Sequence, residues 1–242
     1  MKETIIADNE ENFKTASIIA GVPQCIIFDL DGTLVNTIDD LGLACDYLLE
    51  KHGKALKWTV ADYKNFVGNG AKLLVKRAFE NKLSDSELDS IYEEFKVKYN
   101  EIKLDHAHVY LGMEKVVKKL KDAGIILVVC TNKPDLAAKG MINSLFPENV
   151  FDVVQGALDN KPKKPDPLVP LEILDSLSIK PENTVWIGDS NVDIESARNL
   201  GCLGIGVTWG FRPADNLISA GADIILNKPE DILKIFKIRI DN

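Results

Sequence analysis

The sequence predicts an α/β fold: a Rossmann-like parallel sheet sandwiched by helices, with a helical bundle inserted as a cap domain. The first indication is a set of short, continuous apolar runs, which are typical of strands buried on both faces. From residue 110 onward these runs alternate with helical patterns, as they do in parallel α/β sheets. The third indication is a long stretch of helical spacing between the first apolar run and all the others.

Six apolar runs are predicted to form the strands of this sheet. Each is bounded by turn residues or followed by a polar motif, which marks where the strand ends. The predicted strands are Cys25–Phe28, Ile125–Cys130, Phe151–Gln155, Thr184–Ile187, Leu203–Val207 and Asp223–Leu226. Residues 1–24 precede the first of them, and the sequence assigns this extension no role.

The inserted stretch is predicted to be helical. Apolar residues recur at helical spacing around Leu41–Leu48, Ala71–Phe79 and Leu88–Ile102. The predicted boundaries are 38–109 for the cap domain and 1–37 with 110–242 for the catalytic core. The pair His106 and His108 near the end of the insertion is interpreted as an exposed hinge. Because ligands bind beyond the carboxyl ends of parallel strands, a cap inserted after the first strand would cover the site.

Composition and charge exclude several classes of protein. A net charge of -8, from 37 acidic and 29 basic residues, provides no basic stripe for nucleic acid. The N-terminal stretch does not resemble a signal peptide, and no apolar run approaches the roughly 20 residues that span a bilayer. The four cysteines form no Cys-x-x-Cys pair, so neither zinc nor a disulfide framework is indicated. We expect a cytoplasmic protein without a nucleic-acid or membrane partner, and its oligomeric state stays open.

Two aspartates directly follow the first predicted strand. Asp29 and Asp31 are two residues apart, so an extended backbone would point both carboxylates the same way. One can attack phosphorus as an ionised nucleophile, while the other, kept protonated by its neighbour's charge, gives a proton to the leaving group. Gly32 lets the chain turn sharply after them. The alternative is an ordinary strand-end turn with solvated acids.

A second acidic pair, Asp189 and Asp193, follows the run Thr184–Ile187 and lies close to the start of an expected helix. Carboxylates at adjacent strand ends can converge on Mg²⁺, which prefers about six oxygen ligands. Magnesium would offset the repulsion between an anionic nucleophile and a phosphate. An aspartate before a helix also serves as an ordinary N-terminal cap, which is the alternative role.

Three further residues are candidates for holding a phosphate. Thr131 and Asn132 follow the second predicted strand, where a hydroxyl and backbone amides can bind phosphate oxygens. A plain helix cap is the alternative there. Lys164 lies on a proline-bounded loop and can supply positive charge to a transferred phosphoryl group. Lys161 and Lys163 are close enough in sequence to be alternatives to it.

The cap contains one candidate substrate contact. Glycines at a helix start, followed by basic residues, can receive the anionic tail of a substrate. The segment comprises Gly68, Asn69 and Gly70, and the helix after it carries Arg77. A turn before a solvated helix is the alternative.

Four motifs occur in a fixed order at the ends of the predicted strands. They are Asp29-x-Asp31-Gly-Thr33, Thr131, Lys164 and Gly188-Asp189-x-x-x-Asp193. Together they resemble the haloacid dehalogenase-like superfamily, in its phosphoglycolate phosphatase-like branch with a helical cap after the first motif. The resemblance covers about residues 24 to 227.

The resemblance implies a role for each motif residue. It makes Asp29 the nucleophile and Asp31 the general acid and then base, while Thr131 and Lys164 stabilise the phosphate. It makes Asp189 a magnesium ligand beside Asp29 and the Asp31 carbonyl, and Asp193 a support of the metal site. It also selects Lys164 over its neighbours. The expected substrate contacts are Gly32, Thr33, Asn132, Gly68, Asn69, Gly70 and Arg77.

The expected function is a magnesium-dependent phosphatase that acts on a small phosphorylated metabolite through an aspartyl phosphate. Asp31 disfavours a dehalogenase or a phosphonate hydrolase, because those branches replace it. The segment Phe66–Ala78 resembles the cap of phosphoglycolate phosphatases, so 2-phosphoglycolate is the first candidate substrate. A sugar phosphomutase similar to β-phosphoglucomutase, which Thr33 disfavours, and a pyrophosphatase are alternatives on the same fold. A non-enzymatic binding protein is a third class, against which the complete set of catalytic side chains argues.

Overall fold

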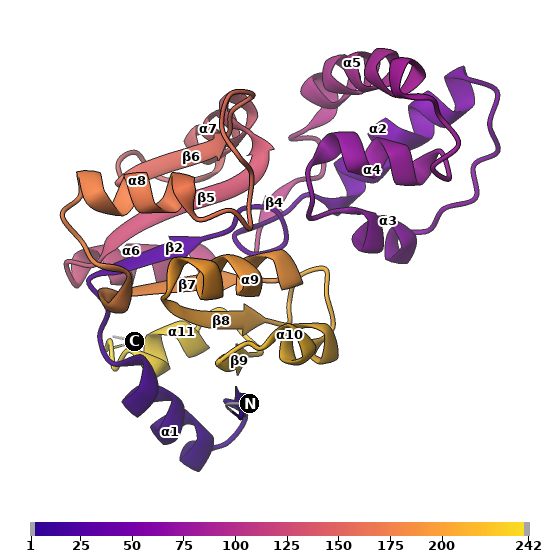
Figure 1. Cartoon of the computed structure of the whole chain (residues 1–242). Coiled ribbons are helices and arrows are strands. Elements are labelled where there is room, and N and C mark those ends of the chain that lie inside the picture. The colour runs from indigo at the N-terminus through magenta and orange to yellow at the C-terminus, as the bar shows by residue number, and fades with distance from the viewer. Residues whose placement is uncertain (1–2, 240–242) are drawn as a thin grey trace.

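The computed structural model of the chain describes residues 3–239 and contains a seven-stranded sheet with helices on both faces (Figure 1). The strand order is β1-β9-β8-β7-β2-β5-β6, and every neighbouring pair is parallel. The predicted α/β fold is therefore confirmed. The strands are β1 (Ile5–Ile6), β2 (Cys25–Phe28), β5 (Ile126–Pro134), β6 (Val153–Ala157), β7 (Thr184–Gly188), β8 (Leu203–Val207) and β9 (Ile224–Leu226).

Apolar clusters cover both faces of the sheet, since successive strand residues point to opposite sides. Ile26 and Phe28 pack into one cluster and Cys25 and Ile27 into another. The first cluster includes residues of α1 (Glu10–Ala20), α6 (Met113–Asp122), α7 (Asp135–Leu145) and α11 (Asp231–Ile235). On the opposite face lie α8 (Leu168–Ser176), α9 (Asn191–Leu200) and α10 (Ala214–Ala220). Burial on both faces explains why the strands read as continuous apolar runs.

Strand β2 occupies the position that matters most for function. It pairs in register with β5 on one side, Phe28 opposite Val129, and with β7 on the other, Phe28 opposite Ile187. The residues after these three strands therefore emerge side by side at one edge of the sheet. Polar groups from distant parts of the sequence meet there.

Apart from shifts of one or two residues at other strand ends, two details of the sheet differ from the prediction. Strand β5 continues to Pro134 rather than ending at Cys130, with an irregularity in its pairing to β6 between these two residues. Thr131 and Asn132 thus belong to the strand itself. The extension also contributes an unpredicted strand, β1, which pairs with β9 through Ile5 and Ile224. Two residues paired with a strand more than 200 positions away leave no local sequence signal.

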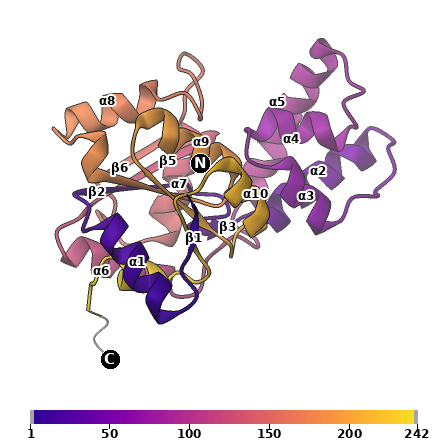
Figure 2. The same ribbon diagram turned by 60° about the horizontal axis from the view of Figure 1, so that its bottom comes forward.

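The N-terminal extension is built into the core. Ala16 of α1 and Ala7 after β1 are fully or almost fully buried in the main apolar cluster, and Phe13 packs against it. Helix α1 lies against α11, as the view from below also shows (Figure 2). The extension therefore covers one edge of the sheet and closes the core beside it.

The inserted stretch forms a bundle of four helices with its own apolar cluster. We call this bundle the cap. Its helices are α2 (Ile38–Lys51), α3 (Val60–Phe66), α4 (Ala71–Ala78) and α5 (Asp85–Ile102). Helix α3 was not predicted, because seven residues are too few for a clear periodicity, although Thr59 and Asp62 form the capping box that starts it. The division into domains at 38–109 stays a prediction.

Both connections between core and cap run side by side. They form the two-stranded antiparallel pair of β3 (Val35–Asn36) and β4 (His108–Val109). Beyond this pair, the buried carboxylate of Asp40 accepts hydrogen bonds from the backbone amides of His106, at 3.0 Å, and Ala107, at 2.9 Å. Backbone pairing and the Asp40 carboxylate thus hold the two connecting segments together. They do so next to His106 and His108, which are interpreted from the sequence as an exposed hinge.

The described part of the chain has no helix long and apolar enough to cross a membrane. Its four cysteines are all free, and Cys25, Cys45 and Cys130 are buried.

Placing a charge at Ala16 tests whether the extension belongs to the core. Ala16→Glu should lower stability by about 3 kcal/mol or more, because the carboxylate would be buried without a partner. Thr15→Glu adds the same charge at the neighbouring exposed position and should change stability by less than about 0.5 kcal/mol. Urea unfolding followed by circular dichroism measures both. Equal stability of the two variants would show that α1 does not pack as described.

Candidate active site

The candidate active site begins where β2 ends. Asp29 follows this strand directly, and its side chain is buried. Its Oδ1 atom accepts a hydrogen bond from the backbone amide of Leu30 at 2.7 Å and forms an ion pair with Nζ of Lys164 at 2.8 Å. Lys161 instead pairs with Glu172 on the protein surface. The structure thus brings Lys164 to Asp29 from the loop between β6 and α8.

Asp189 lies beside Asp29 at the end of β7, in a space made by glycines. Its Oδ2 atom accepts a hydrogen bond from the backbone amide of Phe211 at 2.7 Å, and Thr33 Oγ1 lies 3.3 Å from Oδ1. A Cβ atom at either Gly32 or Gly210 would overlap the Asp189 side chain. Gly32 also has a φ of +87°, which favours glycine. Close backbone approach on two sides therefore fixes this carboxylate.

Asp193, in the first turn of α9, holds Lys164 in place. Its Oδ1 lies 2.8 Å from Nζ of Lys164, and Trp186 Nε1 donates to the same oxygen at 3.3 Å. Its Oδ2 accepts from the amide and hydroxyl of Ser190, which completes a capping box at the start of the helix. Asp193 thus takes part in capping α9 and also contacts Lys164 in the site. The N-cap residue of α9 is Ser190, not Asp189.

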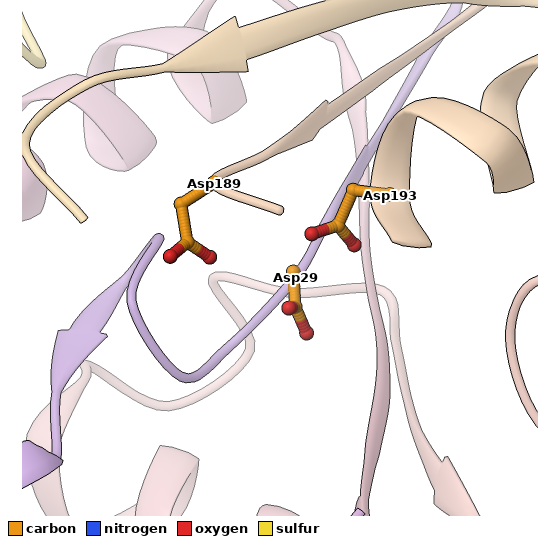
Figure 3. Close-up of side chains that lie close together, drawn as sticks. All are labelled: Asp29, Asp189 and Asp193. Atoms are coloured by element: carbon orange, nitrogen blue, oxygen red, sulfur yellow. The ribbon is translucent and has the colours of Figure 1, made fainter. Parts of the chain in front are cut away.

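The three carboxylates of Asp29, Asp189 and Asp193 converge from β2, β7 and α9 (Figure 3). Each offers an oxygen, and these oxygens lie within 4.8 Å of one another. Burial, followed by the charge of Asp193, raises the pKa of Asp29 to about 7 and that of Asp189 to about 8. Lys164 opposes this rise at Asp29 but does not cancel it. The cluster therefore has an excess of negative charge.

A divalent cation fits this cluster. Mg²⁺ binds oxygens at about 2.1 Å, so its ligands lie up to about 4.2 Å apart, similar to the spacing of these carboxylates. A dication would also neutralise the excess negative charge, which adds to the effect of burial on the two pKa values. The residues that can hold it are Asp29 and Asp189, with Asp193 next to them.

Asp31 points to different partners. Its Oδ1 accepts hydrogen bonds from Thr37 Oγ1 at 2.8 Å and from Nζ of Lys133 at 2.9 Å. The side chain lies outside the triad of converging carboxylates. Its metal contact, predicted through the backbone carbonyl, stays a prediction. The structure therefore separates the two carboxylates of the first motif into two environments, one beside Lys164 and one beside Lys133.

Thr131 and Asn132 lie in the last part of β5 and line the site. Thr131 Oγ1 accepts a hydrogen bond from the amide of Lys133 at 3.2 Å, which leaves its proton for a ligand. The Asn132 side chain makes two hydrogen bonds with the Lys164 backbone and donates a third to the carbonyl of Gly68 in the cap. Asn132 thus ties the lysine loop to the cap.

A cavity of about 760 Å³ lies between core and cap, within the size range of small-molecule sites. The core contributes residues predicted to be catalytic, to bind substrate and to bind metal, and the cap contributes its glycine segment. The predicted residues that line it are Asp29, Asp31, Thr131, Asn132, Asp189, Gly68 and Gly70. Arg77 and Asn69 bond to each other instead, and Arg77 also donates to the carbonyl of Phe66. These two are placed to shape the glycine segment rather than to line the cavity.

The loop after β8 is a part of the site that the sequence analysis did not identify. The backbone amide of Phe211 binds Asp189, while its ring is buried in the apolar cluster of the cap. Arg212 lines the cavity and donates to the backbone carbonyls of Lys64, Asn65 and Val67 at the end of α3. No spacing or motif marks these contacts in the sequence. Two consecutive residues thus connect the carboxylate cluster to the cap.

Lys133 is the second omission. Its side chain is buried, and its ammonium contacts both Asp31 and the hydroxyl of Tyr99 on α5. Burial disfavours its charge, but Asp31 and Tyr99 outweigh this and raise the lysine's pKa above its ordinary value. Its position directly after Thr131 and Asn132 was the available signal, because all three residues end the same strand.

Comparison with known proteins agrees with this geometry. The sequence model of the family "Haloacid dehalogenase-like hydrolase" matches residues 26–207. The chain therefore belongs to the haloacid dehalogenase-like hydrolase family, and the resemblance stated from its motifs is confirmed. The predicted class of enzyme, a phosphatase, is confirmed as well.

The more similar proteins are phosphoglycolate phosphatases by name. The phosphoglycolate phosphatase of Psychrobacter arcticus is 31% identical over 225 residues, which cover 90% of this chain and 94% of the relative. That of Neisseria meningitidis is 37% identical over 194 residues, covering 78% and 81%. The crystal structure of a predicted phosphoglycolate phosphatase from Haemophilus somnus gives a TM-score of 0.80 at 29% identity and covers 88% of this chain and 97% of that one.

The raised pKa values predict that stabilisation by magnesium depends on pH. Asp29 and Asp189 bind protons more tightly in the metal-free folded state than in the unfolded chain, so metal-free stability should fall as pH rises from about 4 through 8. Mg²⁺ must displace these protons. The rise in melting temperature on adding Mg²⁺ should therefore grow between about pH 5 and pH 9. A rise of the same size at every pH would contradict the account.

Gly210→Ala tests the close approach around Asp189. The new Cβ would displace this carboxylate, and we expect a loss of magnesium affinity of roughly 10- to 100-fold. Isothermal titration calorimetry with Mg²⁺ measures it. Gly140→Ala on α7 is the control, because a Cβ there meets no atom within 4 Å. Unchanged affinity in the first variant would show that Asp189 does not need this space.

Proposed function

We propose that the chain is a magnesium-dependent phosphatase that hydrolyses a small phosphomonoester through an aspartyl phosphate on Asp29. The observation that carries this proposal is the position of the Asp29 carboxylate. It is buried at a strand end, paired through one oxygen with Lys164 and adjacent to the carboxylate of Asp189. The Lys164 ammonium on one side of Asp29 and a site for a metal cation on the other suit an ionised nucleophile that reacts with an anionic substrate.

Asp29 and Asp31 carry the two chemical steps. In the first step an oxygen of Asp29 forms a bond to phosphorus, the bond to the leaving oxygen breaks, and Asp31 gives its proton to that oxygen. In the second step Asp31 takes a proton from water, the water oxygen bonds to phosphorus, and the bond to Asp29 breaks. The products are an alcohol and inorganic phosphate, and both aspartates return to their first state.

In this proposal the two oxygens of Asp29 have different tasks. Within residues 3–239, the hydrogen bond from the Leu30 amide and the ion pair with Lys164 both end on Oδ1 of this carboxylate. The other oxygen, Oδ2, is thereby the one that suits attack on phosphorus. Thr131, which lines the cavity, and Lys164, which contacts Asp29, are the groups proposed to bind oxygens of the transferred group.

Asp29, Asp189 and Asp193 provide the site for magnesium. When bound, Mg²⁺ supplies charge that allows an anionic nucleophile and a phosphate to approach each other. Asp29 then serves both as a ligand and as the nucleophile. Phe211 and Gly32 keep Asp189 aimed at the same point. The support for this assignment is the excess negative charge of the buried cluster.

We propose 2-phosphoglycolate as the first substrate to test. The support is the name of the relatives that cover most of this chain, including that of Psychrobacter arcticus. A cytoplasmic location suits an intracellular metabolite of this kind.

We also propose that the cap at 38–109 and the core at 1–37 and 110–242 act as separate domains around the cavity. Their separate apolar clusters support this division.

Asp29→Asn should abolish activity without unfolding the protein. The amide has no free anion for attack, and we expect a loss of phosphate release of at least about 10⁴-fold. A phosphate-release screen with and without Mg²⁺ measures it over 2-phosphoglycolate, hexose phosphates, nucleotides and pyrophosphate. Asp175→Asn makes the same chemical change at an exposed position and should keep full activity. Turnover by Asp29→Asn, or isomerised sugar phosphate without phosphate release, would overturn the proposal.

A further inference from the structure

We propose that Lys133 determines specificity by binding a carboxylate on the leaving group of the substrate. This inference rests on the proposed function and names its substrate class. The class is a phosphomonoester whose alcohol carries a carboxylate within a few bonds of the phosphate. Such a substrate has a second anionic end, which the chemistry at phosphorus does not use.

The two buried lysines of the site stand beside different carboxylates. Lys164 contacts Asp29 and thus adjoins the phosphoryl group in transfer. Lys133 contacts Asp31 at 2.9 Å, and Asp31 is the group that protonates the leaving oxygen. The Lys133 ammonium therefore lies on the leaving-group side of the reaction. Its distance from Asp31 places it within reach of a substituent next to that oxygen.

The ammonium also has a donor available for a ligand. A lysine has three N–H donors, and the described contacts of Lys133 Nζ take two, at Asp31 and at Tyr99, where the distance is 2.6 Å. Only 3% of the side chain is exposed, yet the residue lines the cavity. A buried ammonium at a cavity wall binds an anion more strongly than an exposed one does, because little water competes.

The other cations of the cavity are committed elsewhere. Arg212 donates to backbone carbonyls of the cap, and Lys96 is exposed and pairs with Glu93 at 2.7 Å. Lys103 donates to Asn100. None of these three contacts Asp31 within the described structure. Lys133 is therefore the cation that the geometry offers to the leaving group.

Tyr99 makes this arrangement depend on the cap. Its ring lies with its centroid 4.7 Å from the Lys133 ammonium, and its hydroxyl accepts a hydrogen bond from it. Tyr99 comes from α5, whereas Lys133 and Asp31 come from the core. Tyr99 is thus a positioning residue, and it holds the lysine only while the cap lies over the site.

The test compares two substrates that differ only in the carboxylate. Ethyl phosphate has the length of 2-phosphoglycolate but carries a methyl group in place of the carboxylate. We expect Lys133→Met to lower kcat/KM for 2-phosphoglycolate by roughly 10- to 100-fold more than for ethyl phosphate, mainly through KM. An equal loss on both substrates would mean that Lys133 acts only through Asp31 and would overturn the inference. The inference would also be overturned if Lys133→Met kept full activity and the wild-type ratio of kcat/KM for 2-phosphoglycolate to kcat/KM for ethyl phosphate.

Two further variants keep the test decisive. Tyr99→Phe retains the ring and Lys133 but removes the hydroxyl, and it should reduce the preference for 2-phosphoglycolate by roughly 3- to 10-fold. It carries the test if Lys133→Met does not fold. Lys96→Met removes an exposed cation of the same cavity and should keep the wild-type preference within about twofold. If Lys96→Met lost the preference for 2-phosphoglycolate, the substrate's carboxylate would be assigned to the exposed cap surface near Lys96 and not to Lys133.

Failure of the inference differs from failure of the proposed function. If the wild-type protein releases phosphate from neither substrate in Mg²⁺, then the proposed function fails on these substrates and the role of Lys133 fails with it. If it turns over both substrates at similar kcat/KM, the phosphatase mechanism stands and the specificity role of Lys133 is wrong.

Discussion

The main constraint on this structure is the repulsion among the carboxylates of Asp29, Asp189 and Asp193, which are buried together with Lys164. Such a cluster is unfavourable by itself, because burial and mutual repulsion oppose ionisation. The fold maintains it with backbone amides, a capping box and close-packed glycines. Some of these contacts also stabilise the fold, as the capping box does for α9, but they hold the carboxylates together against their repulsion. They make sense when a divalent cation and a phosphate complete the balance of charge.

The same cluster is connected mechanically to the cap. Phe211 binds Asp189 through its backbone and the cap through its ring, and Arg212 holds the end of α3. Lys133 joins Asp31 of the core to Tyr99 of the cap. A substrate that enters between core and cap therefore meets groups whose positions depend on both. In the account proposed here, the core supplies the chemistry, and the leaving group is selected where core and cap meet.

The sequence was sufficient for the parallel sheet and for the order of the motifs, because doubly buried strands read as continuous apolar runs and the predicted site residues follow their ends. It could not reveal β1, whose two residues pair with a strand more than 200 positions later. Arg212 was missed for a related reason, because its contacts with the cap are not encoded by local spacing. Lys133 directly follows Thr131 and Asn132, but only the fold brings its side chain to Asp31 and Tyr99. Asp29 and Asp189, in contrast, follow strands that are neighbours in the sheet.

The measurement that tests the central claim most directly is a search for phosphate on Asp29 during turnover. The protein is mixed with its best phosphomonoester in Mg²⁺, quenched in acid within the first turnovers and digested for peptide mass spectrometry. The account predicts one phosphoryl group on the peptide that contains Asp29, attached to that side chain. Phosphate release without any phosphorylated Asp29, at a time resolution finer than one turnover, would contradict it.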